Sequence, residues 1–129
     1  MPHVAMVHDK DPKAALLEAL GDTDGFDLFN NQVLCAVYIR PNKTKSGIYL
    51  TDRTTDEDRF QSKTGLIIKT GPSAFEESED WFRQSRPKVG QWAIFRASDG
   101  WNVTVNGVLC RLMDDISIRG RVSHPDLVY

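Results

Sequence analysis

The sequence predicts an all-β fold, a small sandwich or barrel of short strands, preceded by an N-terminal arm that carries one short helix. Two observations predict it. From Gln32 onward, apolar residues recur with a period of two in several short runs. Turn signals rich in Gly, Pro, Asn and Asp separate these runs. The chain has 129 residues, so we expect one domain.

Residues 1–30 form an arm whose pattern is that of a helix. Asp11 suits the N-cap, Pro12 the first helical position and Gly21 the C-terminal cap. The residues between them are mostly Ala, Leu and Glu, which are strong helix formers. A helix of about three turns is marginal in isolation. We therefore expect it to pack against its own barrel or against a neighbouring subunit.

The predicted barrel spans residues 31–122, and its first strand, 32–40, has apolar groups on both faces. That pattern is typical of a strand that is buried on both faces, more so than a strand at the protein surface. Further strands are expected at 65–69, at 92–95 and, as a last short strand, around Ile116 and Ile118.

A hairpin is expected late in the chain, because Asn106-Gly107 stands between two alternating apolar runs. Both residues tolerate positive φ, which makes Asn-Gly the strongest short hairpin signal. Residues 123–129 are expected to form a polar C-terminal tail.

Two loops interrupt the barrel pattern. Residues 41–64 are mostly polar, with one apolar island, Ile48-Tyr49-Leu50, directly after Gly47. An apolar triplet in a charged segment is a liability if it is exposed. Either the triplet starts a strand that folds back onto the barrel, or it is a recognition element that orders on binding.

Composition excludes some classes of function. A net charge of −2 argues against a general nucleic-acid binder, which would usually carry a basic face. No apolar run reaches the length of a membrane span, so we expect no membrane partner. The N-terminus lacks the pattern of a secretory signal, which favours a cytoplasmic location.

No catalytic residue, metal site or cofactor is expected. The three histidines lie in the terminal arms without zinc spacing. The acidic cluster between Asp52 and Asp58 lacks the pattern of a calcium loop. No nucleotide-binding or nucleophile motif is present. Cys35 and Cys110 each lie in an apolar run, which predicts two buried thiols.

The segment Thr44-Lys45-Ser46-Gly47-Ile48-Tyr49-Leu50 resembles the mobile loop of GroES-type co-chaperonins, where a small residue or Gly precedes a hydrophobic triplet. Other segments resemble the family in the same order. They are 65–72 for the second strand and its exit, 87–95 for the K-V-G-D-x-V-x-F segment, 99–108 for the final hairpin and 113–118 for the E-S-D-I-L-A ending.

This resemblance covers roughly residues 28–122, and the chain departs from the family pattern in places. Gln91 stands where the K-V-G-D segment has its Asp, and the stretch from Leu50 to Gly65 is longer than is usual. The arm and the tail have no counterpart in the family.

The resemblance implies a small irregular GroES-like β-barrel with a long flexible loop. It implies a non-enzymatic subunit of a homo-oligomeric ring that caps an ATP-driven, double-ring chaperonin. Gly47, Ile48, Tyr49 and Leu50 would then form the contact with the chaperonin. Residues 72–88 would correspond to a roof-like loop, with its aromatic side chains at Phe75, Trp81 and Phe82.

A structural role is the alternative interpretation. Capsid decoration or cement proteins of a bacteriophage combine a compact body with arms that contact neighbouring subunits, and the arm and tail suit such a role in a virion. The environment of Ile48, Tyr49 and Leu50 would distinguish the two. Fold alone does not, because fold does not fix function.

Overall fold

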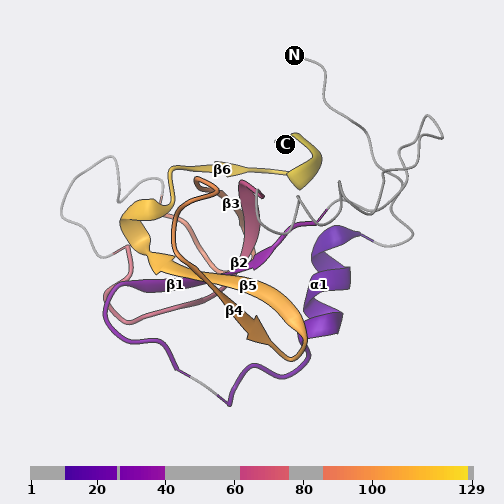
Figure 1. The fold of residues 1–129 in the computed structure, drawn as a ribbon, viewed down its shortest axis with the longest axis horizontal. Helices are drawn as coiled ribbons and strands as arrows, with labels where there is room; N and C mark the ends of the chain where they lie inside the picture. The colour runs from indigo at the N-terminus through magenta and orange to yellow at the C-terminus, as the bar shows by residue number, and fades with distance from the viewer. Residues whose placement is uncertain (1–10, 26, 40–61, 76–85, 128–129) are drawn as a thin grey trace.

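The computed structural model describes residues 11–25, 27–39, 62–75 and 86–127 (Figure 1). It contains one six-stranded antiparallel sheet in the order β4-β5-β1-β2-β3-β6. The elements are α1 (Pro12–Leu20), β1 (Gln32–Val37), β2 (Thr64–Thr70), β3 (Trp92–Ile94), β4 (Trp101–Val105), β5 (Val108–Asp114), β6 (Gly120–Val122) and two short 3₁₀ helices, η1 (Asp115–Ser117) and η2 (Pro125–Leu127).

The structure confirms the predicted all-β fold with one short helix in the N-terminal arm. The strands β4 and β6 stand at the two ends of the sheet order. In the described residues no strand pairing joins these two, so backbone hydrogen bonds do not close the sheet into a complete barrel.

The central strands β1 and β2 are buried on both faces, as the sequence predicts for β1. Alternate residues point to opposite faces of a strand, so the core divides into two clusters. The first cluster contains Leu20, Leu34, Ala36, Tyr38, Leu66, Ile68, Trp92 and Cys110. The second contains Val33, Cys35, Ile67, Phe75, Ala93, Phe95 and Met113. Each face of the sheet therefore has its own core.

The helix α1 begins and ends where the sequence predicts. The Asp11 carboxylate accepts a hydrogen bond from the Ala14 N–H (3.2 Å), and Gly21 follows the last turn with φ +62°. Leu16 and Leu20 pack into the first core cluster, and α1 lies beside β5 (Figure 1). Of the two expected packing partners, the helix therefore uses its own sheet.

The β4–β5 hairpin forms around the predicted Asn-Gly turn. Asn106 and Gly107 have φ values of +50° and +82°, the left-handed conformation that such a turn requires. The Asn106 amide also donates hydrogen bonds to the carbonyl oxygens of Leu20 (2.6 Å) and Asp22 (3.1 Å). The turn thus also holds the end of the arm helix against the sheet.

The predicted strand around Ile116 and Ile118 is wrong. Residues 115–117 form the 3₁₀ helix η1, and the Ile116 side chain is 79% exposed. The backbone N–H of Asp115 donates to the Asn31 carbonyl (3.0 Å) and that of Ile118 donates back to the Asp115 carbonyl (3.1 Å). The first bond continues the pairing of β5 with β1, and the second closes the turn that ends the strand. The last strand is β6, which pairs with β3.

Part of the segment 123–127, which the sequence suggests is a polar tail, is buried. Pro125 is fully buried at the start of η2, although the residues around it have the composition of a solvated tail. A buried proline indicates that this part of the segment packs on the body of the protein.

Arg111 is a buried charge that the sequence analysis does not identify. Its side chain, on β5, is only 4% exposed and lies over the Phe95 ring, 5.6 Å from the centroid. The guanidinium donates to the carbonyl oxygens of Arg96, Ala97 and Asp99. Desolvation lowers the pKa of Arg111, and the charge of Asp99 opposes that change. Arg111 therefore fixes the 96–99 turn to the sheet.

Gly71 stands where two chain segments meet without room for a side chain. A Cβ at this position would lie 2.8 Å from the Phe29 carbonyl oxygen and closer still to the Asn30 carbonyl. The Gly71 N–H donates to the Gln32 carbonyl (2.8 Å), so the segments cannot separate without losing a hydrogen bond.

We predict that Gly71→Ala lowers the free energy of unfolding by about 2–3 kcal/mol, because the backbone must shift to admit the methyl group. Urea unfolding measures this change. Gly25→Ala is the matched control, because a Cβ there meets nothing within 4 Å. We expect that control to change stability by less than about 0.5 kcal/mol. Equal effects of the two substitutions would contradict the tight contact at Gly71.

Candidate functional site

The residues expected to contact a chaperonin, Gly47, Ile48, Tyr49 and Leu50, lie outside the described residues. The structure does describe the two ends of the loop that carries them. These ends are the exit of β1 and the entry to β2, which pair with each other.

The base of this loop is held by a buried serine. Ser62 is fully buried, and its hydroxyl lies within hydrogen-bond distance of the carbonyl oxygens of Tyr38 (2.8 Å) and Thr64 (3.1 Å). The Tyr38 N–H donates to the Thr64 carbonyl (3.1 Å), which closes the two ends of the loop. The base is therefore bound by both backbone and side-chain hydrogen bonds.

The same base is continuous with the core. The Tyr38 ring packs edge to face against Trp92, with ring centroids 5.8 Å apart, an arrangement that aromatic pairs favour. The buried Thr64 hydroxyl donates to the Ala93 carbonyl (2.8 Å) on β3. Because both ends of the loop contact β3, the loop begins and ends on a fixed part of the sheet.

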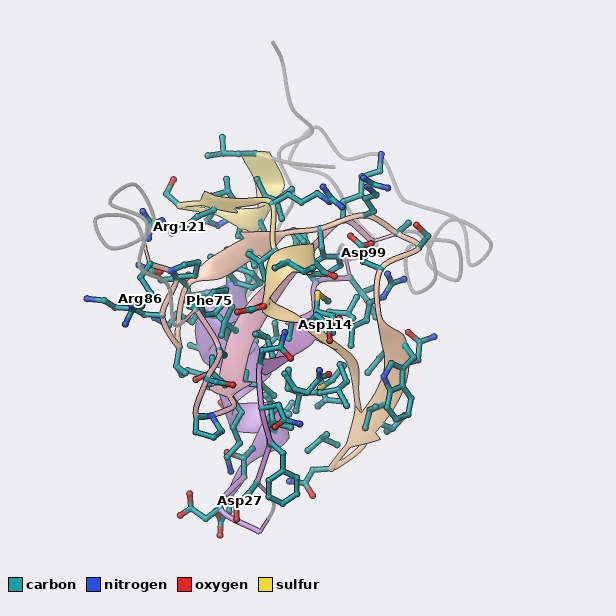
Figure 2. The ribbon with its side chains drawn as sticks, turned by 90° about the vertical axis from the view of Figure 1, so that its left-hand side faces the viewer. Asp27, Phe75, Arg86, Asp99, Asp114 and Arg121 are labelled. Carbon is teal, nitrogen blue, oxygen red and sulfur yellow. The ribbon has the colours of Figure 1, made fainter. Side chains whose placement is uncertain are left out.

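Of the roof-like loop residues, Phe75 is described, whereas Trp81 and Phe82 lie outside the described residues. Phe75 is buried in the second core cluster, with a φ of +58° that is rare for a bulky residue. Figure 2 shows Phe75 and Arg86, which flank the segment 76–85, on the same side of the molecule. Phe75 therefore fixes the start of this loop through the core.

Asp115 holds Phe75 in this conformation. One carboxylate oxygen accepts from the Phe75 N–H (2.8 Å), and the other accepts from the Asn31 amide (3.0 Å). The sequence analysis does not identify this role, because the partners lie 40 and 84 residues away along the chain. The one local signal is the aspartate that directly follows a strand, where the chain turns.

The two cysteines, both among the described residues, are not exposed to reagents in solution. Cys35 and Cys110 are fully buried, as the sequence predicts, and both are free. In the β1–β5 register Cys110 lies opposite Ala36, and Cys35 lies opposite Arg111. Because Cys35 and Ala36 are neighbours on β1, the two thiols point to opposite faces of the sheet. In the described ranges no group of three or more His, Cys, Asp or Glu side chains could hold a metal ion.

The helices in the described part of the chain are all too short, or too polar, to cross a membrane.

Comparisons with known proteins give one finding. A family model described as "Chaperonin 10 Kd subunit" matches residues 26–122. The matched range includes all six strands and both loops, and it leaves α1 and η2 outside. The search of curated proteins returned no match.

We predict that neither cysteine reacts with iodoacetamide in the folded protein at neutral pH, and that both react in denaturant. Burial raises the pKa of Cys110 from 9.0 to about 11 and raises the pKa of Cys35 as well, so little thiolate forms. Mass spectrometry of the alkylated protein measures this. Since both pKa values are higher in the folded state, these thiols leave stability unchanged below pH 9.0 and lower it as the pH rises beyond that value. Alkylation of the folded protein at the rate of a free thiol would contradict the burial.

We predict that Asp115→Ala lowers the free energy of unfolding by about 2–3 kcal/mol, because it leaves the Phe75 N–H and the Asn31 amide without their acceptor. We also expect faster proteolysis between residues 76 and 85. Asp114→Ala is the matched control, because that neighbouring carboxylate accepts one exposed hydrogen bond, from Gln32 (2.6 Å). Its cost should be about 0.5–1 kcal/mol with unchanged proteolysis. If the two variants behave alike, Asp115 does not hold the loop base.

Proposed function

The chain belongs to the chaperonin 10 Kd subunit family, and we propose that it acts as a non-enzymatic co-chaperonin that caps an ATP-driven, double-ring chaperonin. The family match over residues 26–122 is the observation that carries the proposal. It includes Gly47, Ile48, Tyr49 and Leu50, the residues that resemble the family's contact with the chaperonin.

A ring of identical subunits is part of the proposal, since the family's members work as homo-oligomers. Burying one side chain of the Ile48-Tyr49-Leu50 triplet contributes about 1.5–3 kcal/mol. Ordering a loop on binding costs about 2–5 kcal/mol, so a single loop binds weakly. Once one loop of a ring has bound, the other loops of that ring stand close to the chaperonin, so their effective concentration there is high. Weak individual contacts also allow the cap to be released.

The fixed loop base supports this mechanism. Ser62, Tyr38 and Thr64 bind the two ends of the loop to the core of the sheet. Each copy in a ring would therefore start its loop from the same place and in the same direction. Avidity requires this, because it is lost when geometry prevents simultaneous binding.

Residues 72–88 would form the roof-like loop, in which Trp81 and Phe82 contribute aromatic surface for contacts between copies. Phe75 has a separate role, because its ring is buried in its own subunit. It contributes by fixing the start of the loop through the hydrogen bond to Asp115 (2.8 Å).

On this proposal the protein needs no cofactor and works in the cytoplasm, and the ATPase is its partner. Neither the structure nor the family match favours the alternative of a capsid decoration protein. The co-chaperonin function is therefore the single candidate that we retain.

We predict that Tyr49→Asp abolishes capping and leaves the melting temperature nearly unchanged. On this proposal a charge in the triplet would have to be desolvated when the loop binds, and would stay in water in the free protein. Size-exclusion chromatography with light scattering, on the protein mixed with a bacterial double-ring chaperonin and ATP, measures the complex. The wild type should co-elute with the chaperonin when ATP is present.

Ile116→Asp is the matched control, because Ile116 is an exposed apolar residue outside the loop. This variant should cap like the wild type. A large drop in melting temperature for Tyr49→Asp would instead place the triplet in the core of its own subunit. A wild-type ring that ignores the chaperonin would overturn the capping function.

A further inference from the structure

A pocket of about 440 Å³ opens between the start of α1, the turn before β3 and the end of β6. Its lining residues are Asp11, Lys13, Gly90, Gln91, Trp92, Arg121, Val122, Ser123 and His124. Asp11, Lys13, Ser123 and His124 lie outside residues 26–122, so the family match does not cover this pocket as a whole. Its volume is in the range of small-molecule sites.

Basic side chains reach the pocket from separate elements. Lys13 comes from α1, Arg121 from β6 and His124 from the segment that follows β6. Asp11 is the one acidic residue in the lining. With His124 neutral, the lining carries one net positive charge in a protein whose total charge is −2. The pocket therefore has the opposite sign to the protein as a whole.

The Arg121 guanidinium is oriented by a neutral partner. It donates to the Gln91 side-chain oxygen (3.2 Å), which also accepts the Lys88 N–H (2.9 Å). Gln91 stands where the K-V-G-D segment of co-chaperonins has an aspartate. A carboxylate there would offset the charge of Arg121 at short range, whereas the glutamine amide positions the guanidinium and leaves its charge available.

Gly90, next to Gln91 in the same turn, makes room for the Lys13 ammonium group. A Cβ at this position would lie 3.2 Å from the Lys13 nitrogen, closer than most side chains tolerate. The residue also has a φ of +93°, which an L side chain rarely adopts. The backbone of the turn therefore allows the lysine to lie against it.

The single acidic residue is engaged with the helix. The Asp11 carboxylate caps α1 by accepting from the Ala14 N–H (3.2 Å). A helix N-terminus carries a partial positive charge, which compensates part of the charge of a carboxylate placed there. Asp11 thus weakens the positive character of the pocket less than a free carboxylate would.

We propose that this pocket binds a small anion that carries phosphate or carboxylate groups. Lys13, beside Gly90, and Arg121, beside Gln91, would supply charge-assisted hydrogen bonds, which are the strong kind for such groups. Trp92 and Val122 supply the apolar part of the lining. This binding does not depend on capping, so it can be tested on the protein alone.

The experiment is isothermal titration calorimetry of the full chain with inorganic phosphate and, separately, with succinate, each at millimolar concentration. Backbone amide chemical shifts at Lys13 and Gly90 report whether the probe occupies this pocket. Binding of both probes with shifts at these residues would support a general anion site. Binding of one alone would assign the pocket to phosphate or to carboxylate ligands.

Three variants test the residues. Lys13→Gln and Arg121→Gln each remove one charge and should weaken binding about fivefold. Gln91→Asp adds a carboxylate beside Arg121 and should weaken binding by a similar factor. Arg119→Gln is the matched control, because Arg119 lies outside the lining and faces Asp99 (3.7 Å). That control should bind like the wild type.

Circular dichroism confirms that each variant is folded before titration. The proposal is overturned if neither probe binds at millimolar concentration. It is also overturned if Arg119→Gln loses as much affinity as Arg121→Gln, because the effect would then come from overall charge.

Discussion

The burial of β1 and β2 on both of their faces is the constraint on which the rest of the structure depends. A two-sided sheet needs two separate sets of covering side chains, and this short chain supplies them from different elements. The arm helix covers one face through Leu16 and Leu20. Phe75, Phe95 and Met113 cover the other face. Because both faces must be covered, the loops that connect these elements must begin and end at fixed places on the sheet.

Buried or half-buried polar side chains fix the places where the loops leave and rejoin the sheet. Ser62 binds the base of the loop 41–64, Asp115 binds the base of the loop 72–88, and Arg111 binds the 96–99 turn. Each of these side chains bonds backbone groups of a segment that leaves or rejoins the sheet. Apolar contacts hold the sheet together, but they are tolerant of small shifts in position. The hydrogen bonds define where each loop begins, as the proposed ring with equivalent loops would require.

The sequence predicts those features that depend on neighbouring residues. The helix α1 follows from its capping residues, the β4–β5 hairpin from Asn106-Gly107 and the buried thiols from the apolar runs around them. The strand expected at Ile116 and Ile118 is wrong, because alternation alone does not reveal the turn in which the Ile118 N–H bonds the Asp115 carbonyl. The roles of Arg111 and Phe75 depend on partners far along the chain, which no local pattern reveals. The proposed contact role of residues 47–50 rests on resemblance to a family, and these residues lie outside the described part of the chain.

The contact between Asn106 and the arm has a consequence for synthesis on the ribosome. The amide of Asn106 binds the Leu20 carbonyl across 86 residues of sequence. The arm is made before the sheet, yet its docking partner is among the last parts of the sheet to appear. A helix of nine residues is unstable alone, so it forms its lasting structure only when the hairpin is complete. During translation, the apolar side chains of Leu16 and Leu20 therefore stay uncovered until the hairpin is made, which is the condition under which chains aggregate or need chaperones.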